Sequence, residues 1–287
     1  MPRQHNCAQN HQRAIAGALI LLAVLATGCA LLQNACIYRP EPYPVGDWSP
    51  SGLAWEDAWF SSSDGTRLHG WYVPCESPAA TILFAHGIDG NVASLAPQLA
   101  AFCDQHCVSV MVFDYRGYGR SAGSPDEQGL YEDAAAARAW LAEREGILPA
   151  DIVLMGRSLG AAVMVDLAAR EGTRGLILES AFTSLPDVVE QHTLSIPVDW
   201  LLTSRFASIE KIGRYHGPLL MCHGELDSVI GLEQGRELFE AANPPKQFVT
   251  IAGADHCDPP DEDWHRTLDE FLTRLPPLGL ARLPRVQ

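Results

Sequence analysis

One short segment of the chain places a serine where it could act as a nucleophile. The residues Gly156–Gly160 read Gly-Arg-Ser-Leu-Gly, follow the apolar run Ile152–Met155 and precede a stretch of helical character. A serine between a buried strand and a helix lies on a tight turn that exposes its hydroxyl, and the glycines leave room for that turn. The first N–H groups of the helix also favour developing negative charge. The segment therefore predicts Ser158 as the nucleophile of an acyl transfer.

Two later segments each end in a residue that could activate this serine. Asp227 closes the turn after one apolar run, and His256 closes the loop after the next run, Phe248–Ile251. A histidine takes the proton of a serine hydroxyl when a carboxylate fixes its tautomer and stabilises its charged form. The chain order predicts Asp227 as the acid and His256 as the base. Glu179 and Glu225 remain alternatives for the acid.

A glycine-containing loop earlier in the chain could supply half of an oxyanion site. His86, Gly87 and Ile88 follow the apolar run Thr81–Ala85. The predicted oxyanion donors are the backbone N–H groups of Ile88 and of Leu159, which comes directly after the serine. Loss of one such donor typically adds about 3 kcal/mol to the activation barrier. His86 precedes the nucleophile in the chain, so we predict a structural role for its side chain.

Short apolar runs alternate with stretches of helical pattern over most of the chain. Runs this short suit strands buried on both faces of a parallel sheet, and the stretches between them suit helices that cover it. The predicted strands are Thr81–Ala85, Val108–Phe113, Ile152–Met155, Leu176–Leu178, Leu219–Cys222 and Phe248–Ile251. The predicted helices are Leu95–Gln105, Leu130–Arg144, Ala161–Arg170, Gly231–Ala242 and Asp261–Arg274. The sequence thus predicts an α/β fold with a mostly parallel, doubly wound sheet, preceded by an antiparallel N-terminal hairpin.

One long segment, at about residues 185–216, departs from this alternation. It contains helix-like fragments, prolines and several large apolar residues. Irregular segments of this length inside a compact domain usually carry a function, so we predict a small cap above the carboxyl edge of the sheet. The residues predicted to contact a substrate are Phe182, Trp200, Leu201 and Phe206.

The N-terminal residues have the layout of an export signal. A start with two arginines precedes the uncharged, mostly apolar run Ala14–Leu32. Within this run, Leu25–Cys29 resembles a bacterial lipobox, where cleavage leaves a cysteine that carries lipid. We therefore predict a signal peptide over residues 1–28 and lipidation at Cys29, with an uncleaved membrane anchor as the alternative. Both place the remaining chain outside the cytoplasm, tethered to a membrane on its periplasmic or cell-surface side.

Composition narrows the classes of partner. The 287 residues carry a formal net charge of -15, which argues against nucleic acid or an anionic membrane surface as the main partner. The eight cysteines include no CxxC pair and no zinc-site spacing, so no metal is predicted. Cys103 and Cys107 lie four residues apart and could pair in an oxidising compartment.

The chain resembles the α/β-hydrolase superfamily over residues 55–275. Within that superfamily it is most similar to membrane-associated serine hydrolases, the Bem46-like proteins and the ABHD13 and ABHD17 type depalmitoylases. The narrower resemblance lies in Asp114–Ser121, which reads Asp-Tyr-Arg-Gly-Tyr-Gly-Arg-Ser, and in Glu179–Ser184, which reads Glu-Ser-Ala-Phe-Thr-Ser. We predict that the first of these motifs builds a turn beside the active site. The domain boundaries that follow are a tether over residues 29–54, an α/β-hydrolase domain over residues 55–278 and a tail over residues 279–287.

The predicted activity is hydrolysis of carboxylic esters or thioesters through a serine-linked acyl-enzyme. The expected substrate is a small molecule or an acyl chain, and the reaction needs no metal or organic cofactor. A peptidase or an acyltransferase would use the same three residues and remains an alternative. A non-catalytic, membrane-tethered binding protein is the alternative from another class.

Overall fold

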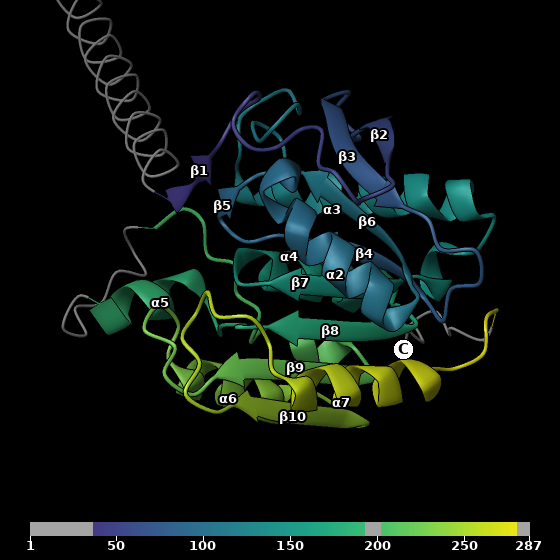
Figure 1. Ribbon diagram of the computed structural model, residues 1–287. Helices are drawn as coiled ribbons and strands as arrows, with labels where there is room; N and C mark the ends of the chain where they lie inside the picture. The colour runs from purple at the N-terminus through teal and green to yellow at the C-terminus, as the bar shows by residue number, and fades with distance from the viewer. Residues whose placement is uncertain (1–36, 193–201, 280–287) are drawn as a thin grey trace, which may run out of the picture. The chain divides into compact units, whose positions relative to one another are not determined.

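The computed structural model describes residues 37–192 and 202–279. The chain divides into two compact units, Met1–Tyr38 and Arg39–Gln287, and nearly all described residues belong to the second. In that unit the main sheet has the strand order β10-β9-β8-β7-β4-β6-β3-β2 (Figure 1). Its strands are β2 (Glu56–Ser61), β3 (Arg67–Val73), β4 (Thr81–Ala85), β6 (Ser109–Asp114), β7 (Val153–Arg157), β8 (Gly175–Glu179), β9 (Leu219–Gly224) and β10 (Lys246–Ile251).

The direction of the strands matches the predicted fold class. Each neighbouring pair from β6 through β4, β7, β8 and β9 to β10 is parallel. The first two strands, β2 and β3, form an antiparallel hairpin that joins the sheet through β6. Every residue of β6 is buried, as expected of a strand covered on both faces. The predicted mostly parallel α/β sheet with an antiparallel N-terminal hairpin is therefore confirmed.

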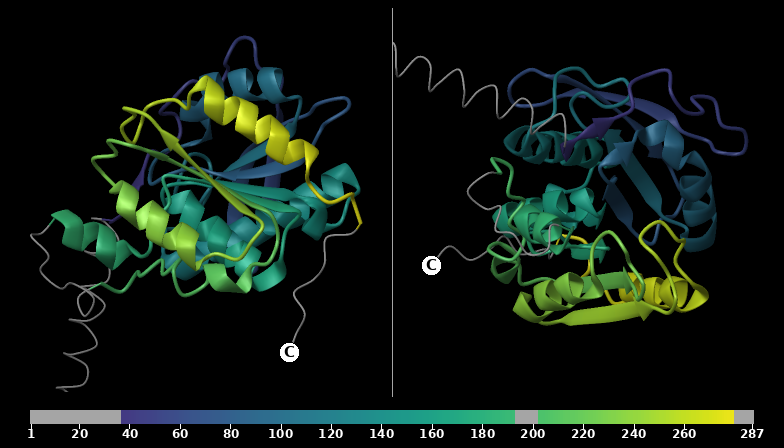
Figure 2. Two further views of the ribbon diagram at one scale, coloured as in Figure 1. Left: turned by 90° about the horizontal axis from the view of Figure 1, so that it is seen from below. Right: turned by 90° about the vertical axis from the view of Figure 1, so that its left-hand side faces the viewer.

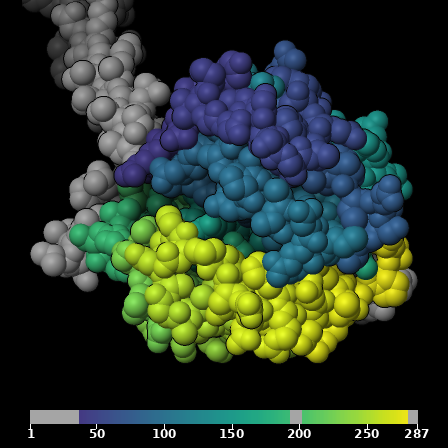
Figure 3. Space-filling view, in the orientation of Figure 1, coloured from purple at the N-terminus to yellow at the C-terminus, as the bar shows by residue number. Residues whose placement is uncertain are grey.

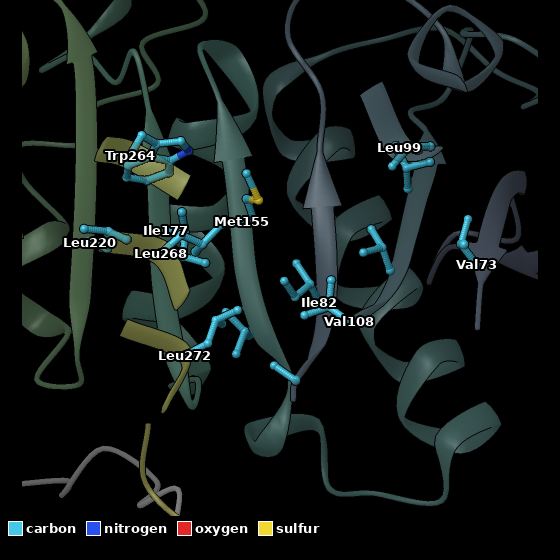
Figure 4. Packing of buried hydrophobic residues seen from close by; sticks show 14 of the residues in the cluster. Val73, Ile82, Leu99, Val108, Met155, Ile177, Leu220, Trp264, Leu268 and Leu272 are labelled. Carbon is cyan, nitrogen blue, oxygen red and sulfur yellow. The ribbon is translucent and has the colours of Figure 1, made fainter. Parts of the chain in front are cut away.

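Helices cover both faces of the sheet. Helices α2 (Ala96–His106) and α7 (Glu262–Thr273) lie on one face, and α3 (Glu127–Glu145), α4 (Leu159–Glu171) and α6 (Leu232–Ala241) lie on the other (Figures 1 and 2). On α7, Trp264, Leu268, Phe271 and Leu272 are buried at positions that share one side of a helix. These side chains meet Ile82, Ile177 and Leu220 of the sheet in an apolar core (Figure 4).

Part of the predicted tether packs against the domain. Within residues 29–54, β1 (Arg39–Pro40) pairs in parallel with β5 (Asp89–Gly90). The amide of Asn91 donates to the carbonyl oxygens of Glu41 and Val45, at 2.9 Å each. The Tyr43 N–H donates to the carbonyl of Gly119 at 2.8 Å. Residues 39–45 are thus held beside the loop that follows β4.

The thiol that contacts Cys107 belongs to Cys75, whereas the spacing in the sequence suggested Cys103. Cys107 caps α2 and its N–H donates to the carbonyl of Cys103 at 3.1 Å. Its Sγ, however, lies 2.9 Å from the Sγ of Cys75, which follows β3. Cys107 itself has a left-handed backbone, with φ of 46°. The structure therefore places Cys107 beside Cys75.

Some predicted features lie outside the described residues. These are the export signal, the lipidated Cys29, the middle of the cap with Trp200 and Leu201, and most of the tail. Of the cap, the structure describes helix α5 (Leu185–His192) and residues 202–216, which include the short helix η3 (Ile212–Arg214). Among the described residues, no helix is both long enough and apolar enough to cross a membrane.

Candidate active site

Ser158 lies on a strained turn between a strand and a helix. Strand β7 ends at Arg157, helix α4 begins at Leu159, and Ser158 between them has φ of 54° and ψ of -119°. A positive φ is unfavourable for a residue with a side chain and persists only where the surroundings enforce it. Here the Ser158 N–H donates to the carbonyl of Glu179 at 2.9 Å. The predicted elbow therefore occurs at the predicted position.

The two glycines of the elbow are required by close backbone contacts. A Cβ atom on Gly156 would lie 2.3 Å from the carbonyl oxygen of Gly160. A Cβ atom on Gly160 would lie 2.0 Å from the carbonyl oxygen of Ala85, at the end of β4. Neither contact is with a flexible side chain that could move aside. The elbow can therefore fold back onto its own helix and onto β4 only with glycine at both positions.

Asp227 and His256 form a hydrogen-bonded pair at the same sheet edge. The Nδ1 of His256 lies 2.8 Å from the Oδ2 of Asp227. The other carboxylate oxygen accepts the N–H groups of Val229, at 3.0 Å, and Ile230, at 2.8 Å. Burial opposes ionisation of Asp227, but hydrogen bonds from His223, His256 and Ile230 outweigh it and hold its pKa well below the usual range. The carboxylate is thus ionised and aimed at His256.

The topology places the three residues at the same edge of the sheet. Ser158 follows β7, Asp227 follows β9 and His256 follows β10. Strands β7, β8, β9 and β10 are consecutive and parallel in the sheet, so their carboxyl ends meet at one edge. Ligand sites of open α/β sheets lie at this edge. Glu225 and Glu179, the alternative acids, make no hydrogen bond to His256 among the described residues.

His223 supports the acid, a role that the sequence did not reveal. Its side chain is fully buried, and its Nε2 lies 2.8 Å from the carbonyl oxygen of Ile230 and 3.3 Å from the Oδ2 of Asp227. Both neighbours are acceptors, so Nε2 carries the proton. A Cβ atom on Gly235 would lie 2.4 Å from the Nδ1 of this ring, so that glycine makes room for it. The ring therefore ties Asp227 to the loop that follows it.

The loop predicted to hold the oxyanion lies beside the serine. A Cβ atom on Gly87 would lie 3.7 Å from the Cβ of Ser158. The Nδ1 of His86 lies 2.8 Å from the carbonyl oxygen of Gly87 and must donate, because that oxygen can only accept. This carbonyl belongs to the same planar peptide unit as the Ile88 N–H, so the contact fixes the direction of that N–H. Burial lowers the pKa of His86, which favours the neutral ring.

Two tyrosines of the Asp114–Ser121 motif hold this loop from the other side. The hydroxyl of Tyr115 donates to the carbonyl of His86, and that of Tyr118 donates to the carbonyl of Ile88, each at 2.8 Å. The motif thus supports the loop on which the predicted oxyanion donor lies. Leu159, the second predicted donor, begins α4, where the first N–H groups have no partner within the helix.

Of the residues predicted to contact a substrate, the structure describes Phe182 and Phe206, whose segments are joined by the hydrogen bond from the Ile209 N–H to the Thr183 carbonyl at 3.0 Å. Phe182 and Phe206 are both buried, and Phe206 packs edge-on against Tyr131 with ring centroids 5.8 Å apart. Neither lines the narrow crevice beside His256, whose walls include Glu179 and Ser180. Within the described part of the chain, no group of three His, Cys, Asp or Glu side chains is placed to hold a metal ion.

Comparisons with known proteins agree with the α/β-hydrolase fold. Residues 76–210 match a family described as serine aminopeptidase, S33. The uncharacterized protein Rv2307c of Mycobacterium tuberculosis is 37% identical over 268 residues, which cover 90% of this chain and 95% of that protein. Human alpha/beta hydrolase domain-containing protein 17B is 32% identical over 203 residues, covering 69% of this chain and 67% of that protein. The solved Pyrococcus furiosus esterase Pf2001 shares the fold, with a TM-score of 0.65, 21% identity and coverage of 83% of this chain and 99% of its own.

Proposed function

Because this chain belongs to the α/β-hydrolase superfamily, among hydrolases of the ABHD type, we propose that it is a serine-dependent hydrolase of carboxylic esters or thioesters. The observation that carries the proposal is the 2.8 Å hydrogen bond between His256 and Asp227, at the sheet edge that also holds the strained Ser158. An esterase is also among the solved proteins that share its fold.

The proposed reaction is a two-step acyl transfer. The Ser158 hydroxyl attacks the carbonyl carbon of the ester or thioester while His256 takes its proton. The Ile88 and Leu159 N–H groups stabilise the negative charge on the carbonyl oxygen. The leaving alcohol or thiol departs with the proton from His256, which leaves an acyl group on Ser158. Water then attacks this acyl group with His256 again as base, and the acid is released.

Asp227 acts through His256 in this mechanism. Its carboxylate holds the ring with Nδ1 protonated, so that Nε2 is free to take the serine proton. The charge of Asp227 also stabilises the imidazolium that forms. Its low pKa keeps the carboxylate ionised across the whole range in which a histidine base can work.

The test is hydrolysis of p-nitrophenyl esters from acetate to palmitate by the full chain and by its Ser158→Ala variant. Ser63→Ala, in the turn between β2 and β3, is the matched control. We expect turnover that is lost in Ser158→Ala and kept in Ser63→Ala. A fluorophosphonate should label the protein covalently at one site. Mass spectrometry should locate the added mass on the peptide that contains Ser158. Turnover that survives Ser158→Ala would refute the assignment.

The match to the serine aminopeptidase family makes a peptidase the second candidate. Aminoacyl p-nitroanilides, which present an amide in place of an ester, separate the two activities. Cleavage of the anilides at a rate close to that of the esters would favour the peptidase.

We also propose that the chain is exported and held at a membrane by lipid on Cys29. A Cys29→Ser variant expressed in a bacterium should then leave the membrane fraction. Continued membrane association of this variant would favour an uncleaved anchor.

A further inference from the structure

An apolar pocket of about 360 Å³ lies between helices α2 and α7. Its walls include Phe84, Leu99, Phe102, Val110, Met155 and Trp264. The two helices cover one face of the sheet, and Figure 3 shows the surface hollowed where the segments that carry them meet. The volume lies within the range of pockets that hold small molecules. The proposed hydrolysis uses none of these side chains.

A buried donor in this pocket has no partner. Trp264 is fully buried, and its Nε1 makes no hydrogen bond among the described residues. Figure 4 shows this nitrogen on the side of the ring that faces Met155, another wall of the pocket. An unpaired buried N–H costs about 1–3 kcal/mol, and buried indole nitrogens usually find an acceptor. The nitrogen therefore points to a ligand that brings an acceptor oxygen.

The inner end of the pocket carries a positive charge. Arg157 and Glu179 line the pocket as well as the crevice beside His256, and they are register partners at the ends of β7 and β8. Burial raises the pKa of Glu179, against the opposing effect of the Arg157 charge. The Arg157 guanidinium donates to the carbonyl oxygen of His256, which is neutral. Among the described residues Arg157 forms no ion pair within 4.0 Å, so its guanidinium can still donate to an anion at this end of the pocket.

We propose that the pocket binds a long-chain carboxylate, with its alkyl tail between α2 and α7 and its carboxylate at Arg157 and the Trp264 N–H. The apolar walls match the tail, and the unpaired donor and the guanidinium match the two oxygens of the head group. A neutral amphiphile would leave the Arg157 charge without an anion. A cationic one would be repelled by it. An acid of this kind is what the proposed hydrolysis would release, but binding here needs no turnover.

The pocket mouth allows a direct test. Ala101 is exposed on α2 at the rim, so Ala101→Trp fills the entrance without touching the core. Ala139→Trp, on an exposed position of α3, is the matched control. Binding of dodecanoate is measured by calorimetry on the full chain carrying Ser158→Ala, so that no chemistry contributes. We expect saturable binding that Ala101→Trp weakens by at least about 10-fold and that Ala139→Trp leaves unchanged.

The charge of the head group is tested separately. Arg157→Gln should weaken dodecanoate binding by about 10-fold or more, because a charged hydrogen bond is lost. Binding of dodecan-1-ol, which has the same tail and no charge, should change far less. The proposal is overturned if dodecanoate does not bind, if Ala101→Trp leaves its affinity unchanged, or if Arg157→Gln weakens both ligands equally. None of these outcomes depends on whether Ser158 is a nucleophile.

Discussion

Replacing His86 with phenylalanine tests how the predicted oxyanion loop is held. The variant keeps a buried ring against Tyr115 and Tyr118, whose centroids lie 4.6 and 5.5 Å from that of His86. It removes the ring N–H that donates to the Gly87 carbonyl at 2.8 Å. The peptide unit that carries the Ile88 N–H then loses one of the contacts that fix its direction.

The expected loss of rate lies between two limits. A hydrogen bond worth about 1 kcal/mol corresponds to roughly 5-fold in rate. Loss of the whole oxyanion donor corresponds to about 100-fold or more. We therefore expect kcat to fall by roughly 5-fold to 100-fold, with a smaller change in KM, because the oxyanion exists only in the transition state.

The free energy of unfolding should change much less than the rate. His86→Phe removes one hydrogen bond, but it also removes Nε2, a buried nitrogen with no partner among the described residues. The two effects oppose each other and are each about 1–3 kcal/mol or less.

Steady-state kinetics on p-nitrophenyl butyrate and chemical denaturation give both quantities. The control is His106→Phe, another buried histidine, which ends α2 and pairs with Asp269 of α7 at 2.6 Å. We expect this control to lose stability and keep kcat. If His86→Phe kept its full kcat, or lost activity only in proportion to its stability, the reasoning would be refuted.

Three further predictions concern other parts of the domain. Gly160→Ala places a Cβ atom 2.0 Å from a backbone oxygen of β4. The variant should lower the free energy of unfolding by about 3 kcal/mol or more, as measured by urea denaturation. A variant as stable as the parent protein would contradict this prediction. Because the folded pKa of Asp227 is depressed, its ionisation stabilises the fold above the unfolded pKa of about 4 and that contribution is lost as pH falls further. The Tm deficit of Asp227→Asn should thus be large at neutral pH and shrink below about pH 4. Glutathione disulfide should oxidise the Cys75 and Cys107 thiols to one S–S bond, and two molecules of glutathione thiol are released. Peptide mapping should find this bond in the Cys103→Ser variant. The Cys75→Ser variant should lack it.

The sheet could be predicted because its central strands, β6 to β9, are buried on both faces. Such strands appear in the sequence as short apolar runs, and the bounds of β4 agree with the prediction to the residue. The elbow could be predicted because its backbone allows only glycine two residues before and two residues after Ser158. The residues that define the elbow are therefore close together in the sequence. Asp227 and His256 could be predicted in the same way, because each follows directly after a predicted strand.

Other features of the site have no local pattern. His86, Tyr118 and His223 each act through a hydrogen bond to a backbone carbonyl, and a backbone carbonyl is present at every position of any sequence. Only the fold selects which carbonyl each side chain meets. The pairing of β1 with β5 joins two-residue segments that are too short to show any periodicity. The pocket between α2 and α7 arises from two helices that are far apart in the chain.

The backbone of Ser158 has a consequence for how this protein would evolve. Its φ of 54° is one that glycine adopts freely and serine does not, and such strain costs of the order of 1–3 kcal/mol. A Ser158→Gly variant would relieve it at once. A laboratory selection for heat resistance alone would therefore favour loss of the serine, and so would a lineage that no longer needed the reaction. Under the proposed role of Ser158, relatives with glycine at this position would keep the fold and lack the reaction.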